Sequence, residues 1–128
     1  MKSIIRLIVV SLFMFIAAPA WSDSAVHMFH CIAEEETTDV ELDAIASEWL
    51  AAAKKMRGGE NLEIFMYFPV AVGAGDHDFS FMIMAPNFEQ MGAFMDAYPG
   101  SPLEEIDDRF DQLAHCPISD MWEAIAIK

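Results

Sequence analysis

Four short stretches of the chain are rich in apolar residues, as β-strands are. Each stretch is flanked by turn-forming residues. They span residues 25–33, 62–72, 79–85 and 119–127. Three consecutive glutamates at 34–36 end the first stretch, because adjacent carboxylates cannot be buried together. The polar, glycine-rich segment 73–78 separates the second stretch from the third and predicts a hairpin. Within the second stretch, Pro69 indicates a bulge, a kink or an edge position.

A long helix is predicted between the first two strands. Thr38 and Glu41 form a capping box, which pairs the first free amides of a helix. From Leu42 to Met56 apolar residues then recur at helical spacing. Gly58 and Gly59 are expected to end this helix in the left-handed conformation. The basic residues expected to complement its carboxyl end are Lys54, Lys55 and Arg57.

Two shorter helices are predicted between the third and last strands. Each begins with a capping pair, Asn87 with Gln90 in the first and Ser101 with Glu104 in the second. A Pro-Gly pair at 99–100 separates them, and Pro117 is expected to end the second. The residues expected to be buried are Phe88, Met91, Phe94, Met95 and Tyr98, followed by Leu103, Ile106, Phe110 and Leu113.

The resulting order, strand, helix, strand, strand, broken helix, strand, is the βαββαβ pattern of a ferredoxin-like α+β domain with a four-stranded antiparallel sheet. We expect one such domain over residues 23–128. In this topology the last strand lies antiparallel to the first and beside it. The end of the first strand, at Cys31, should therefore lie near the entry to the last strand, at Cys116.

The first 22 residues read as a cleaved signal peptide. Lys2 and Arg6 precede an apolar run over 7–18, and the Ala-Pro-Ala sequence at 18–20 fits signal peptidase. An uncleaved anchor is the alternative, but a spanning helix needs about 20 apolar residues. The mature protein is expected to be periplasmic or secreted, with no membrane contact after cleavage.

Export changes how charge and cysteines are interpreted. Loss of Lys2 and Arg6 takes the net charge from −14 to −16, which makes nucleic acid an improbable partner. An oxidising compartment favours a Cys31–Cys116 disulfide over two buried free thiols, and two cysteines lack the spacing of a structural zinc motif.

Both sides of the predicted sheet are apolar, as the runs 64–68 and 81–84 show. The helices can cover only one side, so the other must meet a second subunit, a ligand or both. This layout resembles the dimeric α+β-barrel superfamily, in which two ferredoxin-like units pack sheet to sheet around a cavity. That superfamily includes antibiotic-biosynthesis monooxygenases, haem-degrading enzymes and stress-responsive proteins. The resemblance implies a homodimer; no catalytic motif accompanies it.

Candidate ligand contacts come from the strands. His27 and His30 lie three residues apart, so they point to opposite faces and cannot chelate one metal ion as a pair. Either histidine could act as a base or a haem ligand, or be a hydrogen-bonded core residue. Tyr67, Phe81 and Trp122 would line a hydrophobic cavity or form a dry dimer core.

Other polar groups favour structural roles. His77 lies in the hairpin turn between two aspartates, which is too sparse for a calcium loop. The methionines could bind cuprous ion, but their strand and helix spacing favours packing. Glu63 and Glu123 lie within strands and are expected to face water, with acid–base work in a cavity as the alternative.

The sequence thus predicts an exported dimeric binding or structural module that encloses a small apolar ligand, with no cofactor and no bound metal. Two alternatives remain open. One is a cofactor-independent monooxygenase acting on an aromatic substrate, with a histidine or Tyr67 assisting proton transfer. The other is a haem- or copper-handling protein that uses His27 or His30.

Overall fold

A computed structural model describes residues 23–70 and 75–127; the predicted signal peptide lies outside these ranges. The elements in chain order are β1 (Ser24–Ala33), α1 (Asp39–Ala53), β2 (Glu63–Tyr67), β3 (Phe79–Ala85), α2 (Phe88–Ala97), α3 (Leu103–Phe110) and β4 (Ala114–Ala124). The strands form one sheet in the order β2-β3-β1-β4, and every pair of neighbours is antiparallel. The predicted ferredoxin-like βαββαβ fold is confirmed.

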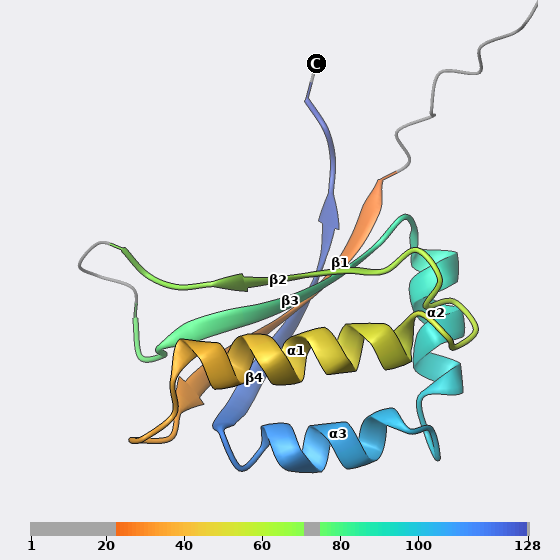
Figure 1. The fold of residues 1–128 in the computed structure, drawn as a ribbon. Coiled ribbons are helices and arrows are strands. Elements are labelled where there is room, and N and C mark those ends of the chain that lie inside the picture. Colours follow the sequence, from red (N-terminus) through yellow and green to blue (C-terminus); the bar gives the residue numbers. More distant parts are fainter. Residues whose placement is uncertain (1–22, 71–74, 128) are drawn as a thin grey trace, which may run out of the picture.

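The helices lie on one side of the sheet, with α1 and α3 side by side and α2 at one end (Figure 1). The core fills the space between the two layers. Its largest fully buried side chains are Leu42, Leu62, Phe79, Met91 and Leu103. We call the other side of the sheet, on which none of the helices in the described part of the chain packs, the open face. Among the described residues, no helix is long and apolar enough to cross a membrane.

The disulfide forms as predicted. Cys31 and Cys116 are bonded, and their Cα atoms lie 4.0 Å apart. β1 and β4 pair directly, and their register shifts between His30 and Ile32, next to Cys31. The bridge therefore joins the central strand β1 to the edge strand β4 across this irregularity.

α1 begins as predicted but ends earlier. The Thr38 hydroxyl accepts a hydrogen bond from the Glu41 amide, and the Glu41 carboxylate accepts one from the Thr38 amide. The helix ends at Ala53, so no basic residue occupies its last turn, and the predicted extension to Met56 is wrong. Gly58 has φ +79° in the turn that follows, where a Cβ would lie 2.5 Å from the α2 backbone. The glycine permits this close approach of turn and helix.

The boundary between α3 and β4 also differs from the prediction. α3 ends at Phe110, and β4 begins at Ala114, before Pro117. Ala114 pairs with Ala33 and His115 with Ile32, so strand pairing with β1 overrides the helical pattern there. Pro117 follows these pairs on the edge strand, at the register shift, where its missing amide is tolerated.

Two smaller predictions need correction. β2 is shorter than residues 62–72, because its ladder with β3 ends at Tyr67, and residues 71–72 lie outside the described ranges. On α2, Met91 and Phe94 are buried as expected, whereas Phe88 and Met95 are 47% and 45% exposed. The apolar stripe of α2 is therefore wider than the surface that it buries.

Strand register defines what lies on the open face. Side chains alternate along each strand, so Val26, Met28 and His30 on β1 point away from the helices. Their neighbours on β3 are Met84, Met82 and Ser80, and those on β4 are Trp122, Asp120 and Ile118. Phe65 and Tyr67 complete the face from β2. The open face is thus mostly apolar and has a polar centre near His30.

Candidate functional site

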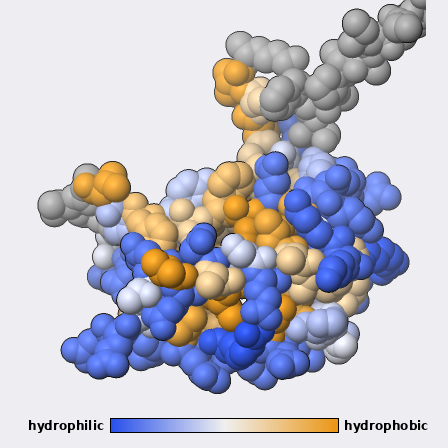
Figure 2. Space-filling model, viewed as in Figure 1, coloured by the Kyte–Doolittle hydropathy of each residue, from blue (hydrophilic) through white to orange (hydrophobic). Residues whose placement is uncertain are grey.

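A cavity of about 560 Å³ lies between the sheet and the three helices. Residues from β1, α1, β3, α2, α3 and β4, and from the turns after α2 and α3, line it. Figure 2 shows apolar side chains emerging on this side of the molecule through a largely hydrophilic surface. The aromatic side chains in its wall are Phe29, Trp49, Phe81, Phe94, Tyr98 and Phe110. A cavity of this size and composition can enclose a small molecule with an apolar body.

The secondary structure explains why these rings converge. Phe29 and Phe81 are paired across β1 and β3, so both point toward the helices. Trp49 belongs to the buried stripe of α1, and its ring meets Phe81 edge-on with centroids 5.7 Å apart. Phe110, at the end of α3, also contacts Phe81, with ring centroids 5.7 Å apart. The wall therefore contains aromatic rings that contact one another edge to face.

A polar network enters this apolar wall from α3. The Asp107 carboxylate accepts a hydrogen bond of 2.9 Å from Trp49 Nε1 and another from the Tyr98 hydroxyl. Partial burial raises the pKa of Asp107, although the two hydrogen bonds oppose the rise. Burial and the neighbouring Asp107 raise the pKa of Tyr98, which keeps its hydroxyl protonated as a donor. Three side chains from different elements are thereby held in one arrangement.

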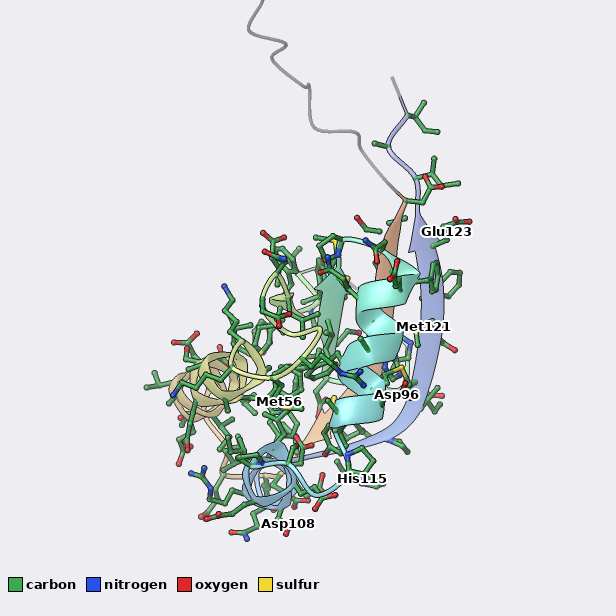
Figure 3. The ribbon with its side chains drawn as sticks, turned by 90° about the vertical axis from the view of Figure 1, so that its right-hand side faces the viewer. Met56, Asp96, Asp108, His115, Met121 and Glu123 are labelled. Carbon is green, nitrogen blue, oxygen red and sulfur yellow. A yellow bond between two sulfur atoms is a disulfide. The ribbon has the colours of Figure 1, made fainter. Side chains whose placement is uncertain are left out.

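Two histidines complete the polar part of the cavity. His27 lies against Phe29, with ring centroids 4.2 Å apart, and burial lowers its pKa. The imidazole is therefore favoured in its neutral form, which can accept a proton. His115 lines the cavity beside Cys116 of the disulfide. Figure 3 places His115 at the start of β4, below α2 and close to α3.

A second polar cluster lies on the open face. His30 Nε2 is 3.0 Å from Asp120 Oδ2, and Ser80 Oγ lies 3.3 Å from both His30 Nδ1 and His77 Nε2. Because a carboxylate only accepts, His30 donates to Asp120 through Nε2. Ser80 lies between the two imidazoles and can pair with both. This chain of hydrogen bonds satisfies Ser80, which is buried among apolar neighbours.

The five predicted ligand contacts divide between the two faces of the sheet. His27 and Phe81 line the cavity. His30, Tyr67 and Trp122 lie on the open face, where Tyr67 and Trp122 are exposed. The structure therefore does not bring the five together. No group of three or more His, Cys, Asp or Glu side chains in residues 23–70 and 75–127 is placed to hold a metal ion.

The predicted ligand contacts do not include the Asp107 network. The sequence places Tyr98, and the stripe from Leu42 to Met56 that contains Trp49, on buried helix faces. A signal was present, however. Asp107 follows Leu103 by four residues and precedes Phe110 by three, so it falls on the apolar stripe of α3. An acidic residue on such a stripe needs a buried partner, and Trp49 and Tyr98 supply it.

The comparisons with solved structures define the fold class. A Dabb-family protein with a ferredoxin-like fold from Mesorhizobium loti matches with a TM-score of 0.52 and 9% identity, covering 84% of this chain and 100% of that one. A mutant of SnoaB, a cofactor-independent oxygenase from Streptomyces nogalater, matches with a TM-score of 0.51 and 7% identity, covering 84% and 96%. These matches show that the chain has a ferredoxin-like fold.

A further match is a dimeric ferredoxin-like protein of unknown function from Thermobifida fusca, with a TM-score of 0.47 and 11% identity, covering 80% of this chain and 90% of that one. No protein-family model and no curated protein sequence matches the chain. At identities this low, the likeness concerns the fold.

Proposed function

We propose that this protein is an exported dimeric module that binds a small molecule with an apolar, aromatic body in the cavity between its sheet and its helices. The observation that carries the proposal is the cavity itself, which has about 560 Å³ of space and six aromatic rings in its wall. Burial of apolar ligand surface there supplies about 25 cal/mol per Å². His27, Tyr98 and Asp107 offer the polar contacts that would orient the guest.

The ligand proposal is tested by filling the cavity without touching the core. Met95 lies in the cavity wall and is 45% exposed, so Met95→Trp places a large ring at the cavity without unfolding α2. Phe88→Trp is the matched control, because Phe88 is equally exposed on the same helix but lies outside the cavity wall. A thermal-shift screen of aromatic, lipid and sugar panels should find apolar hits that Met95→Trp weakens and Phe88→Trp leaves unchanged. Stabilisation by sugars alone would contradict the proposal.

Dimerisation is proposed through the open face. Ile118 and Trp122 are 58% and 57% exposed there, and Phe65 and Tyr67 are exposed on the opposite edge of the sheet. Exposed apolar side chains at both edges of one sheet face, with the half-buried Met28 and Met84 between them, are unusual for a monomer in water. In the dimeric α+β-barrel layout, a second copy of the chain would cover the open face by packing sheet to sheet.

Light scattering at micromolar concentration tests the dimer. Ile118→Glu places a charge in the proposed dry interface and should yield a monomer. Val40→Glu is the control, since Val40 is 78% exposed on α1, on the helical side of the molecule. It should remain dimeric. A monomeric mass for the unmodified protein would refute the interface.

Export is proposed from the signal pattern in residues 1–22 and is supported by the Cys31–Cys116 disulfide, which forms in oxidising compartments. Amino-terminal sequencing of protein recovered from the native host should begin after Ala20 or Ser22. An intact amino terminus at Met1 would contradict cleavage.

A second candidate function is oxygenation of an aromatic substrate without a cofactor. The specific observation in its favour is the neutral His27 in an aromatic cavity, on a fold shared with the oxygenase SnoaB. His27 would accept a proton from the bound substrate. Oxygen uptake that depends on an aromatic hit from the ligand screen, and that His27→Gln abolishes, would establish it. An absorption spectrum of the natively purified protein separates both functions from haem handling, which requires a Soret band.

A further inference from the structure

The side chains of the cavity wall that carry a full charge are acidic. Asp107 and Asp111 contribute carboxylates, whereas no lysine or arginine among residues 23–70 and 75–127 lines the cavity. The remaining titratable groups in the wall are His27, Tyr98 and His115. A guest therefore enters a region of negative potential.

Asp107 lacks a cationic partner. Its two hydrogen-bond donors, Trp49 Nε1 at 2.9 Å and the Tyr98 hydroxyl, are both neutral. The nearest basic residue in sequence, Arg109, pairs instead with Glu48 on α1. Within the described residues the ion pairs are His30–Asp120 and Glu48–Arg109, so neither compensates Asp107. A half-buried carboxylate without a counter-charge favours a cation over a neutral or anionic group at the same place.

The aromatic wall meets the other requirement of a cation site. Trp49 contacts Phe81 at an interplanar angle of 80° and Phe94 at 67°, and Phe81 meets Phe110 at 65°. In such edge-to-face contacts the face of an aromatic ring carries the negative part of the quadrupole, and these rings line the cavity. A positive group within about 6 Å of several ring faces gains attraction that a neutral group of equal shape does not.

We propose that the ligand of this cavity is an organic cation, a molecule with an aromatic or aliphatic body that bears a substituted ammonium group. The ammonium lies near Asp107, and the body lies against the aromatic wall. This inference rests on the proposed ligand-binding function and adds the charge of the ligand. An anionic guest is opposed by Asp107 and Asp111, and a neutral guest leaves the Asp107 carboxylate uncompensated.

Three probes that share a benzyl group test which ligand charge the cavity prefers. Benzyltrimethylammonium is the cation, neopentylbenzene is its neutral isostere, and phenylacetate is an anion of similar size. Dissociation constants are measured by NMR titration of the mature, disulfide-bonded protein at low salt. The cation should bind at least tenfold more tightly than the neutral isostere, and phenylacetate more weakly than either.

Substitutions then test whether Asp107 causes the preference for a cation. Asp107→Asn keeps an oxygen acceptor for Trp49 and Tyr98 but removes the charge, and it should reduce the cation preference about tenfold. Asp108→Asn is the matched control, since it removes the same charge from an exposed position on α3 outside the cavity wall (Figure 3). It should leave the preference unchanged. If Asp107→Asn fails to fold, Asp111→Asn at the cavity wall provides the second test and should weaken the cation about threefold.

The outcomes separate this inference from the one on which it rests. Equal or tighter binding of neopentylbenzene overturns the cation preference and leaves the cavity as a site for neutral apolar guests. An equal loss in Asp107→Asn and Asp108→Asn assigns the effect to net charge and also overturns the proposal. If none of the three probes perturbs the cavity residues, ligand binding in the cavity fails as well.

Discussion

At the scale of single residues, Asp107 and His27 show how burial decides chemistry. Both lie in the same cavity wall, and partial burial raises the pKa of Asp107 while it lowers that of His27. The cause is the same for both residues, because desolvation opposes the charged form of each group. Asp107 offsets this cost through Trp49 and Tyr98, whereas His27 favours its neutral form.

Replacement of Trp49 by Phe tests the Asp107 network. The change keeps an aromatic ring between Phe81 and Phe94 but removes the Nε1 donor that lies 2.9 Å from Asp107. A hydrogen bond to a charged group contributes about 1.5–3 kcal/mol. Urea unfolding at neutral pH should show a loss of stability in this range. An unchanged midpoint with an unchanged slope would mean that the hydrogen bond contributes nothing.

The lowered pKa of His27 predicts a pH dependence of stability. Because the folded-state pKa lies below the ordinary value of 6.5, the unfolded chain binds more protons between the two values. The stability that neutral His27 contributes is present above pH 6.5 and is lost as the pH falls through the folded-state pKa. Relative to His27→Gln, the unmodified protein should lose unfolding free energy between about pH 7.5 and pH 5. Parallel pH profiles for the two proteins would argue against the shift.

At the scale of elements, local signals placed the starts of α1 and α2 better than the ends of the helices. The predicted capping pair of Ser101 and Glu104 is wrong, because α3 begins after Pro102 and has no side-chain cap. The capping box of Thr38 and Glu41 sets the start of α1, and the Asn87 side chain caps α2 through the Gln90 amide at 2.8 Å. By contrast, α1 and α3 end before their patterns do. At the end of α3, strand pairing of Ala114 with Ala33 competes with the helix and prevails.

Thr38→Ala tests how much the capping box contributes. The substitution removes the acceptor for the Glu41 amide and should lower the unfolding free energy by about 1 kcal/mol. Thr38→Ser keeps the hydroxyl and should lie within a few tenths of a kcal/mol of the unmodified protein. Thermal unfolding of the three proteins side by side provides the measurement, and equal losses in both variants would refute the capping role.

At the scale of the whole molecule, the sheet separates two environments. The helical side encloses the cavity and the core, while the open face presents apolar edge strands around a polar centre of His30, Ser80 and Asp120. The Cys31–Cys116 disulfide ties the central strand to the edge strand that contributes to both sides. One sheet can therefore serve a partner and a ligand without conflict.

Removal of the disulfide should affect the entire fold. In the chain-entropy model, a bridge over 85 residues stabilises by about 4 kcal/mol, and native bridges in small exported domains contribute about 2–5 kcal/mol. The double variant Cys31→Ala with Cys116→Ala should show a loss in this range by urea unfolding. Peptide mapping without reductant should find the two segments linked in the unmodified protein; two alkylatable thiols would contradict the bridge.

The sequence by itself determined the order of the elements, and with it the ferredoxin-like topology and the Cys31–Cys116 pairing. The physical reason is that hydrophobic period and capping chemistry are local properties, and few topologies accommodate the order βαββαβ. The opposite orientations of His27 and His30 also follow from the alternation of a strand alone.

Tertiary structure alone decided which residues meet. Trp49, Tyr98 and Asp107 come from α1, the turn after α2, and α3, and only the packing of these segments brings their polar atoms together. Likewise, Tyr67, Phe81 and Trp122 are all aromatic residues of apolar strands in the sequence. The register of the sheet, however, turns Phe81 to the cavity and the other two to the open face. Contacts between distant segments depend on packing and register, which a linear pattern does not contain.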